Sequence, residues 1–412
     1  MISLFEQALH IFSPWYIDDL KFDEEKKRLD VIVDFKRGST FVYKDPETGL
    51  EGVHKAYDTK DKVWRHLNFF EHETYIHCRT PRIKANGKVK LIDPPWSGKA
   101  NGFTLLFEAW LLSMCKDMPI STAAKKMGIS DDKAWRVLEK YVNLARENEN
   151  FSHIQGIGMD ETSRAKGHVY ISLFVDLEKK RTIYVADGKD SGAVADFARD
   201  FKSHGGDCDK VVDISCDMSP AYIKGVGEQF KNASITFDKF HIIKIINEAV
   251  DKTRKEEVVE DDVLKGKKYH FLKNRKNLTA TQTRELNTML KKPKKLKTIR
   301  AMLIREAFQE IYTRKDHASF EKALRDWYWW ATHSRLPHVI SAAKTIKSHW
   351  EGVLNWKSSE ISNGILEGLN SVVQAAKNKA RGYSTSKCYK IVAYLVTGNL
   401  DFQRLNPAFG IV

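Results

Sequence analysis

Alternation of apolar and polar positions predicts a first group of β-strands in the N-terminal hundred residues. The first two predicted strands flank Arg37-Gly38, and the last two are separated by a short polar gap, as in hairpins. A segment containing Pro and Gly, residues 94–98, then interrupts the pattern. Residues 1–100 are therefore predicted to form a small β-rich domain. The predicted strands are residues 29–35, 39–43, 63–70 and 73–78.

A helical pattern replaces the alternation over residues 101–150. Residues 103–117 are mostly apolar, and residues 120–138 divide into two short helices around Gly128, the second beginning after Ser130. This is the pattern of a helix-turn-helix, whose second helix enters the DNA major groove. A plain helical hairpin is the alternative. On the second helix, Lys133, Arg136 and Lys140 are expected to face DNA, whereas Ala134, Val137, Leu138 and Tyr141 are expected to face the core.

A second group of strands follows residue 150 and carries two aspartates. Asp160 is expected on or just after a first strand, beside a hairpin formed by residues 168–175 and 181–185. Asp217 ends an apolar strand that begins near residue 210. The carboxyl ends of strands in open α/β sheets usually carry the chemistry. Both aspartates are therefore candidate catalytic residues.

A third strand, residues 234–237, leads into an Asp-x-x-His spacing. Asp238 and His241 are expected on one face of the helix that follows. Two interpretations stay open at this point. The pair contacts a phosphate or supports a metal site, or it is simply a helix N-cap with a packed histidine.

A third acid lies far downstream, in a segment that begins at Asn363 and opens a helical pattern running to about Lys379. Glu367 and Asn370 are neighbours on one face of this helix, and Asn363 lies one turn earlier. Three carboxylates in one pocket repel one another unless cations neutralise them, and hard cations such as Mg²⁺ prefer oxygen ligands. Glu367 and the two aspartates together therefore predict a site for two Mg²⁺ or Mn²⁺ ions that catalyses phosphoryl transfer. Alternatively, they are three of 54 acidic residues that stand at strand ends and helix starts.

A basic helical segment, residues 254–355, separates the second aspartate from the glutamate. Between Lys265 and Arg300 there are thirteen Lys or Arg residues and one acid, Glu285. Such a concentration predicts a surface that binds DNA phosphates, and a solvated charged face is the alternative. The candidates are Lys267, Lys268, Lys273, Arg275, Lys276, Lys291, Lys292, Lys294 and Lys295, together with Lys377, Lys379 and Arg381 after the glutamate.

Composition and net charge indicate which class of protein this sequence encodes. The net charge of +14 in a chain with 42% hydrophobic residues indicates a folded protein with an anionic polymer partner, most often nucleic acid. Five scattered cysteines without a Cys-x-x-Cys pair indicate a reducing cytoplasm, and they make a zinc site unlikely. The chain has no apolar run of the roughly 20 residues that a membrane helix needs, so no membrane association is expected.

Several motifs together resemble the bacterial insertion-sequence transposases of the ISL-three family, over nearly the whole chain. They are Met159-Asp160-Glu161, Asp217 to Tyr222, Phe237 to His241, Asn363 to Asn370, and Ala380 to Tyr383. One departure is clear, because the family's N-terminal Cys-x-x-Cys-type zinc ligands are absent here. The resemblance therefore does not carry zinc over to this chain.

The resemblance implies an α+β multidomain fold with an RNase H-like α/β core in two parts, residues 151–253 and 356–412. The helical segment would be an insertion between those parts. It also implies a DDE transposase with Asp160, Asp217 and Glu367 as catalytic residues. Asp238, His241, Asn363 and Asn370 would support them. The expected partners are the terminal inverted repeats of the element, target DNA and a second copy of the chain, at the nucleoid. A non-catalytic DNA-binding regulator and a structure-selective nuclease are the alternatives.

Overall fold

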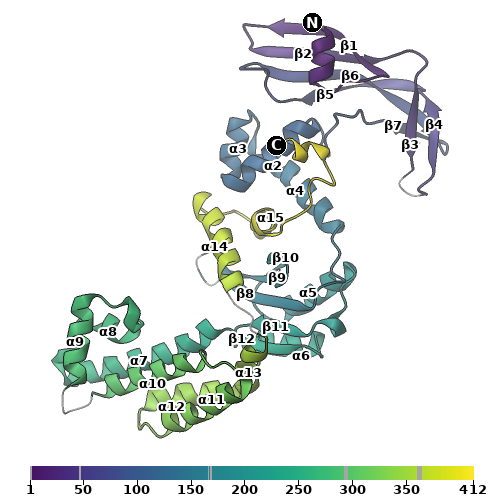
Figure 1. Ribbon diagram of the computed structural model, residues 1–412. Helices are drawn as coiled ribbons and strands as arrows, with labels where there is room; N and C mark the ends of the chain where they lie inside the picture. Colours follow the sequence, from purple (N-terminus) through teal and green to yellow (C-terminus); the bar gives the residue numbers. More distant parts are fainter. Residues whose placement is uncertain (1, 46–47, 166, 168, 292–295, 360–363) are drawn as a thin grey trace. The chain divides into compact units, whose positions relative to one another are not determined.

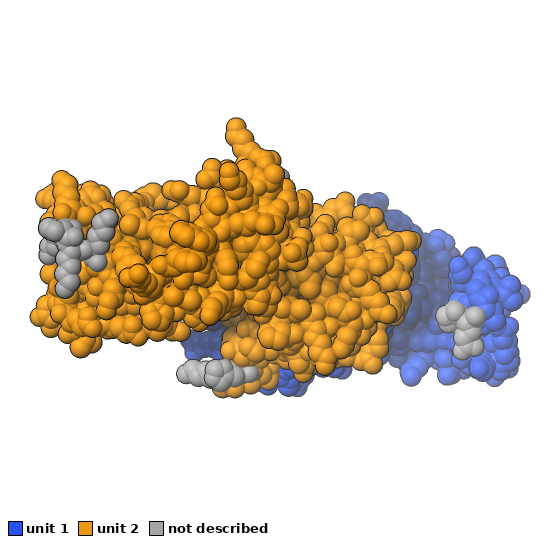
Figure 2. Space-filling view, turned by 90° about the horizontal axis from the view of Figure 1, so that it is seen from below, with its two compact units in different colours: residues 1–149, 375–412 blue, residues 150–374 orange. Residues whose placement is uncertain are grey.

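The computed structural model describes residues 2–45, 48–165, 167, 169–291, 296–359 and 364–412. The chain forms two compact units. The first combines residues 1–149 with residues 375–412, and the second comprises residues 150–374, as coloured in Figure 2. Both contain helices, and sheets occur in each, so the predicted mixed α+β, multidomain class is confirmed. The division of the chain into five domains stays a prediction.

A five-stranded sheet forms the N-terminal part of the first unit (Figure 1). Its order is β1-β2-β6-β5, with β7 paired to β6, and helix α1 (Ile2–Ala8) precedes it. Buried residues such as Trp15, Val31 and Trp64 form its core. The antiparallel pairing of β5 with β6 confirms the second predicted hairpin, although β5 ends earlier than expected. The strands are β1 (Trp15–Asp23), β2 (Arg28–Phe35), β5 (Asp58–Arg65), β6 (Glu73–Ala85) and β7 (Lys88–Leu91).

The first predicted hairpin is wrong. Strand β2 pairs antiparallel with β1 and parallel with β6, whereas β3 (Thr40–Lys44) pairs with β4 (Glu51–Lys55) in a separate two-stranded sheet. The reason is burial. Alternate residues of β2 are buried, so this strand occupies the middle of a sheet and needs two long neighbours. Strand β3 is short and mostly exposed, and it pairs with the nearby β4, next to a hydrogen bond from the N–H of Asp45 to the carbonyl of Leu50.

Three helices and the C-terminal segment complete the first unit. They are α2 (Leu105–Asp117), α3 (Ile120–Lys126), α4 (Asp131–Glu147), α15 (Ser386–Thr397) and the 3₁₀ turn Pro407–Gly410. Gly128 has φ +67° between α3 and α4, a left-handed value that glycine adopts without strain. The four residues of α4 that were expected in the core are all buried, which confirms that part of the prediction.

A buried hydrogen-bond network ties these helices together. The carboxylate of Glu108 on α2 accepts from the backbone N–H groups of Lys99 (2.7 Å) and Ala100 (2.8 Å) and from the hydroxyl of Tyr141 (2.7 Å). The side-chain amide of Asn406 donates to the Tyr141 oxygen (2.9 Å) and to the carbonyl of Leu105 (2.8 Å). Helix α4 is thus fixed to α2 and to the C-terminal segment through paired buried polar groups.

The second unit is built on a five-stranded sheet of order β10-β9-β8-β11-β12 (Figure 1). Strands β8, β9 and β10 run antiparallel, as the predicted hairpin requires, while β11 and β12 run parallel to β8. Helices α5 (Ser191–Ser203) and α6 (Pro220–Gln229) pack on this sheet through buried rings that include Phe174, Phe197 and Phe230. The strands are β8 (Gly156–Ala165), β9 (Val169–Asp176), β10 (Arg181–Asp187), β11 (Asp213–Cys216) and β12 (Ser234–Phe237).

The described residues between 239 and 359 are helical. Helices α7, α10, α11 and α12 lie together as a bundle, and α8 and α9 lie at its end away from β12 (Figure 1). Helix α13 packs along β12, and Asn355 donates to the carbonyl of Ile235 at 2.9 Å, which satisfies a group on the edge strand. The helices are α7 (Lys239–Glu260), α8 (Lys268–Leu272), α9 (Ala280–Leu290), α10 (Lys297–Ile311), α11 (His317–Thr332), α12 (Pro337–Ser348) and α13 (Trp350–Ser359), and α14 (Gly364–Lys379) follows them.

Candidate functional site

Asp160 lies within strand β8, and Asp217 directly follows the neighbouring parallel strand β11. Ser215 of β11 pairs with Gly158 of β8, so two residues further along each chain bring Asp217 and Asp160 into step. Side chains two residues apart share a face of a strand, and neighbouring strands are about 4.8 Å apart. The strand register therefore brings the two positions near one another, and the catalytic role of both aspartates stays a prediction.

Burial, together with repulsion from neighbouring carboxylates, raises the pKa of both aspartates. Burial raises the pKa of Asp160 to about 6, with smaller contributions from the charges of Asp238 and Asp217. Burial also raises the pKa of Asp217, against the opposing effects of the Ser219 N–H and of His241. A carboxylate pair of this kind is stabilised in its charged form by a cation, because opposite charge lowers a pKa.

Asp238 and His241 stand at the start of α7, close to that pair. The Asp238 carboxylate caps the helix by accepting from the N–H of Phe240 at 2.7 Å, and its own N–H donates to the carbonyl of Cys216 at 3.1 Å. Nδ1 of His241 lies 3.7 Å from Oδ2 of Asp238. This Nδ1 is buried and makes no hydrogen bond to any described residue. The N-cap interpretation is confirmed for Asp238, and His241 keeps an unused polar atom beside the two aspartates.

Helix α14 contacts the carboxylate of Asp160 through Asn370. Its Nδ2 donates a hydrogen bond to Oδ2 of Asp160, and one turn later Nε2 of Gln374 donates to Oγ1 of Thr162 at 2.6 Å. Leu366 packs on β8 at Gly158, where an added Cβ would lie 2.7 Å from its Cδ2. The glycine therefore permits the close approach of helix and strand. Oδ1 of Asn370 is buried and has no hydrogen-bond partner among the described residues.

The structure does not bring the third acid into this cluster. Glu367 is exposed in the first turn of α14, on the same helix face as Asn370. Within the described ranges, no group of three or more His, Cys, Asp or Glu side chains is arranged to hold a metal ion. Asn363 lies outside the described residues. The described site thus contains Asp160, Asp217, Asp238, His241 and Asn370.

The donor chemistry of this site suits a hard cation. Two aspartate carboxylates and the unpaired amide oxygen of Asn370 are oxygen ligands of the type that Mg²⁺ and Mn²⁺ accept. A buried polar atom without a partner costs free energy unless a ligand or water satisfies it. The residues present therefore fit a divalent ion with oxygen coordination.

Sequence reasoning missed one charged pair at this site. Nζ of Lys189, in the loop after β10, lies 3.1 Å from Oε2 of Glu161, the residue that follows Asp160. The same Nζ lies 4.1 Å from the centre of the Tyr170 ring. The only signal in the sequence is a lysine between a glycine and a helix-capping aspartate, and that pattern does not indicate which strand it approaches.

The candidate DNA-binding residues differ in their solvent exposure and in whether an acidic side chain pairs with them. Lys133, Arg136 and Lys140 are exposed on α4. In the insertion, Arg275 makes a two-pronged contact with Glu306, at 2.8 to 3.0 Å, and Lys267 lies 3.7 Å from Glu285. The exposed members of the remaining set are Lys268, Lys273, Lys276, Lys291, Lys379 and Arg381, with Lys377 half-buried. Lys292, Lys294 and Lys295 lie outside the described residues.

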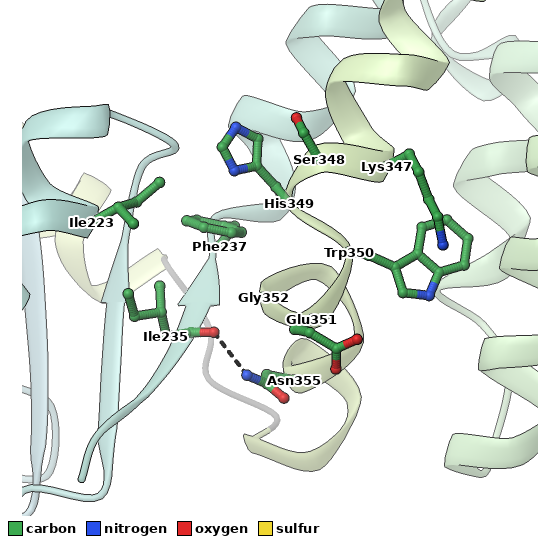
Figure 3. A pocket seen from close by; sticks show the side chains of 10 residues that line it. All are labelled: Ile223, Ile235, Phe237, Lys347, Ser348, His349, Trp350, Glu351, Gly352 and Asn355. Atoms are coloured by element: carbon green, nitrogen blue, oxygen red, sulfur yellow. Dashed lines mark hydrogen bonds between the residues drawn. The ribbon is translucent and has the colours of Figure 1, made fainter. Parts of the chain in front are cut away.

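A pocket of about 450 Å³ opens beyond the edge strand β12 (Figure 3). Phe237 and Ile235 line one side, and His349 and Trp350, from the junction of α12 and α13, line the other. His349 meets Phe237 edge-on with ring centres 5.2 Å apart. The pocket is mainly apolar and contains none of the residues in the carboxylate cluster.

Comparison with known proteins agrees with these features. The family model described as "Transposase" (ISL3) matches residues 157–393, which include both aspartates, Glu367 and the helical segment. A second model, "Helix-turn-helix domain of transposase family ISL3", matches residues 92–142 and so includes α3 and α4. No described helix is long and apolar enough to cross a membrane.

Two curated transposases are similar over most of their length. The transposase for insertion sequence element IS1557 of Mycobacterium tuberculosis is 22% identical over 434 aligned positions, covering 96% of this chain and 95% of the relative. The transposase for IS1001 of Bordetella parapertussis is 22% identical, covering 80% of this chain and 82% of the relative. The family match extends over more than half of the chain and includes the carboxylate cluster and α14. This protein, with its DNA-binding helix-turn-helix, therefore belongs to the transposase family ISL3 of insertion sequences.

Proposed function

We propose that the chain cuts DNA at the terminal inverted repeats of its element and joins the freed ends to target DNA, using Asp160, Asp217 and Glu367. The single observation that carries the proposal is the hydrogen bond between Asn370 and Asp160. It joins a strand and a helix that are 210 positions apart in sequence, and so brings the helix that carries Glu367 to the aspartate pair. Glu367 precedes Asn370 by three residues, about 4.5 Å along the helix axis.

The order of the central sheet supports an RNase H-like core. Three antiparallel strands are followed by two strands parallel to the first, with Asp160 in the first strand and Asp217 directly after the fourth in chain order. The proposed cluster would then lie beyond the paired part of β8 and β11, and α/β sheets commonly bind ligands at the carboxyl ends of parallel strands. The helices described between residues 254 and 355 would then belong to the insertion before Glu367.

Each residue of the site has a role that follows from its position. Asp160, Asp217 and Glu367 would hold divalent cations, and Asn370 keeps Asp160 oriented through its hydrogen bond. His241, beside Asp238, presents an unpaired nitrogen that can donate to a phosphate oxygen or accept from a water. Bound Mg²⁺ or Mn²⁺ would supply activation of a water or 3′-hydroxyl and stabilisation of the leaving oxygen.

DNA would be held outside this cluster by the basic surfaces. Exposed cations on α4 are placed to contact a major groove, and those of the insertion can neutralise backbone phosphates. Since one reaction joins two element ends, we propose that the active form on DNA is a dimer or a larger assembly, acting at the nucleoid in the cytoplasm. The first hundred residues are proposed to help read the repeat.

The test is cleavage of a duplex that carries the terminal repeat, with Mg²⁺ and the purified full-length chain. Asp217→Asn is expected to reduce cleavage by at least about 100-fold, because it removes a charge at the reacting phosphate. Asp213→Asn is the matched control, since Asp213 begins the same strand, at the end away from the cluster. It is expected to cleave like the wild type.

Three results would contradict the proposal. Undiminished cleavage by Asp217→Asn would remove that residue from the mechanism. A wild-type chain that binds the repeat tightly but never nicks it in Mg²⁺ or Mn²⁺ would instead favour a DNA-binding regulator. Cleavage without joining to a second duplex would favour a nuclease.

A further inference from the structure

The backbone on both sides of Lys189 is held in place. The N–H of Gly188 donates to the carbonyl of Tyr170 at 3.0 Å, and the hydroxyl of Ser172 donates to the carbonyl of Gly188 at 2.8 Å. On the other side, Asp190 caps α5 by accepting from the N–H of Ala193 at 3.0 Å. The loop between β10 and α5 therefore presents Lys189 from a fixed position on the second unit.

The side chain of Lys189 is held less firmly than its backbone. Its ammonium contacts both carboxylate oxygens of Glu161, at 3.1 and 3.3 Å, and lies over the Tyr170 ring. The lysine side chain is 48% exposed and that of Glu161 is 28% exposed. Ion pairs at such exposure contribute little to stability, so this lysine can change partners at small cost.

The ion pair of Lys189 and Glu161 lies close to the proposed catalytic aspartates. Glu161 follows Asp160 in β8, where successive side chains point to opposite faces of the sheet, so its link to the cluster is through Asp217. The charges of Glu161 and Lys189 both act on Asp217, where Glu161 adds to the rise in pKa that burial causes and Lys189 opposes it. A DNA strand that reaches the two aspartates adds phosphate charge next to Glu161, which repels it. The same phosphate attracts a lysine, which binds phosphates as a compact point charge.

We propose that Lys189 is a phosphate-binding residue of the active site, and that it exchanges Glu161 for a phosphate of the DNA strand lying across Asp160 and Asp217. This inference rests on the proposed cleavage of DNA at that cluster. Before DNA binds, Glu161 keeps the ammonium in position above Tyr170. After DNA binds, Lys189 positions the strand, while the carboxylates retain their own role.

The first test measures the affinity of the full-length chain for the repeat duplex across a salt series, without divalent ions. Lys189→Gln is expected to reduce the slope of log affinity against log salt by about 0.9, the value for one lost phosphate contact. Lys202→Gln, an exposed lysine near the end of α5, removes the same charge and should leave the slope unchanged. Lys189→Arg should keep the slope, since it keeps the cation.

The second test identifies the phosphate. Each phosphate around the cleavage position is replaced in turn by an uncharged methylphosphonate, and cleavage in Mg²⁺ is measured below saturation. Lys189→Gln is expected to cut unmodified DNA about tenfold more slowly. For one phosphate position, the reduction in cleavage rate caused by Lys189→Gln and the reduction caused by the methylphosphonate should not be additive. The reason is that each change alone removes the same contact.

The outcomes separate this inference from the proposed function. If the wild type cleaves, and Lys189→Gln keeps both the wild-type slope and rate, the phosphate contact is refuted while the cleavage proposal stands. If the wild type never cleaves but Lys189→Gln still lowers the slope, the contact is supported and the cleavage proposal fails. Unchanged urea midpoints of the Gln and Arg variants would show that folding is intact.

Discussion

Asn370 on helix α14 donates a hydrogen bond from Nδ2 to Oδ2 of Asp160 on strand β8. The residue that contacts the aspartate is thus the amide, and not Glu367 three positions earlier, which is exposed. Helix α14 therefore has two separable features on one face. An amide fastens the helix to the sheet, and a carboxylate one turn away is available for a cation or DNA.

Substitutions at these two positions should affect different properties. Asn370→Ala is expected to lower the free energy of unfolding by about 1–2 kcal/mol, because it removes a donor from a half-buried carboxylate. Glu367→Ala should change stability by less than about 0.5 kcal/mol, as is usual for exposed positions, yet abolish cleavage. Urea unfolding without divalent ions and a cleavage assay measure the two effects. Equal urea midpoints for both variants would mean that the amide does not fasten α14.

Glu108 should give the first unit a pH-dependent stability. Burial raises the pKa of Glu108 to about 7, from 4.5, although Tyr141 and two backbone N–H groups donate to it. Between those values the folded chain binds a proton that the unfolded chain has lost, so stability falls as pH rises. The contribution reaches up to about 3 kcal/mol.

The variant Glu108→Gln should remove this dependence while keeping the shape of the side chain. Urea midpoints measured at several pH values from about 4.5 to about 7.5 should then show a smaller decline than in the wild type. Glu147→Gln, at the exposed end of α4, is the control and should keep the wild-type decline. A decline of the same size in Glu108→Gln would assign the effect to another group.

Lysines and arginines of the basic insertion should differ in how much their substitution changes the salt dependence of DNA binding. Lys268 and Lys273 are exposed, and their Nζ atoms lie 5.9 and 5.6 Å from the centre of the exposed Tyr269 ring. Arg275, in contrast, donates to both carboxylate oxygens of Glu306. The double variant Lys268→Gln/Lys273→Gln is expected to lower the salt slope of DNA binding by up to about two units. Arg275→Gln should leave the slope unchanged and lower stability slightly, because it breaks an ion pair.

A salt series with labelled DNA, alongside urea unfolding, checks these two expectations. Lys322→Gln, an exposed lysine on α11, serves as the control for loss of one charge. If the double variant binds with the wild-type slope, these lysines belong only to a solvated surface.

Local signals in the sequence were enough to predict much of the architecture. The helix-turn-helix follows from Gly128 and from apolar spacing along α4. The two aspartates are candidates because they stand in or next to predicted strands, and the structure has Asp160 inside β8 and Asp217 directly after β11. The sequence near a strand does not indicate which distant strand it pairs with. The partners of β2 are fixed by its burial against β1 and β6, and the nearby β3 run is therefore not its partner.

The candidate site could be predicted in outline but not in its contacts. Spacing puts Glu367 and Asn370 on one face of α14, yet the rotation of that helix decides which of them reaches Asp160. Packing of Leu366 on Gly158 sets that rotation. The pairing of Lys189 with Glu161 depends in the same way on strand register and a loop anchor.

The hydrogen bonds of Asn406 have a consequence for protein synthesis. This residue contacts Tyr141 of the DNA-reading helix from 265 positions further along the chain. A ribosome that has just finished α4 must still add every residue from 148 to 406 before the network around Glu108 can close. Until Asn406 has emerged, the growing polypeptide therefore lacks the hydrogen bonds that this residue makes to Tyr141 and Leu105, and α4 is held by fewer contacts than in the folded protein.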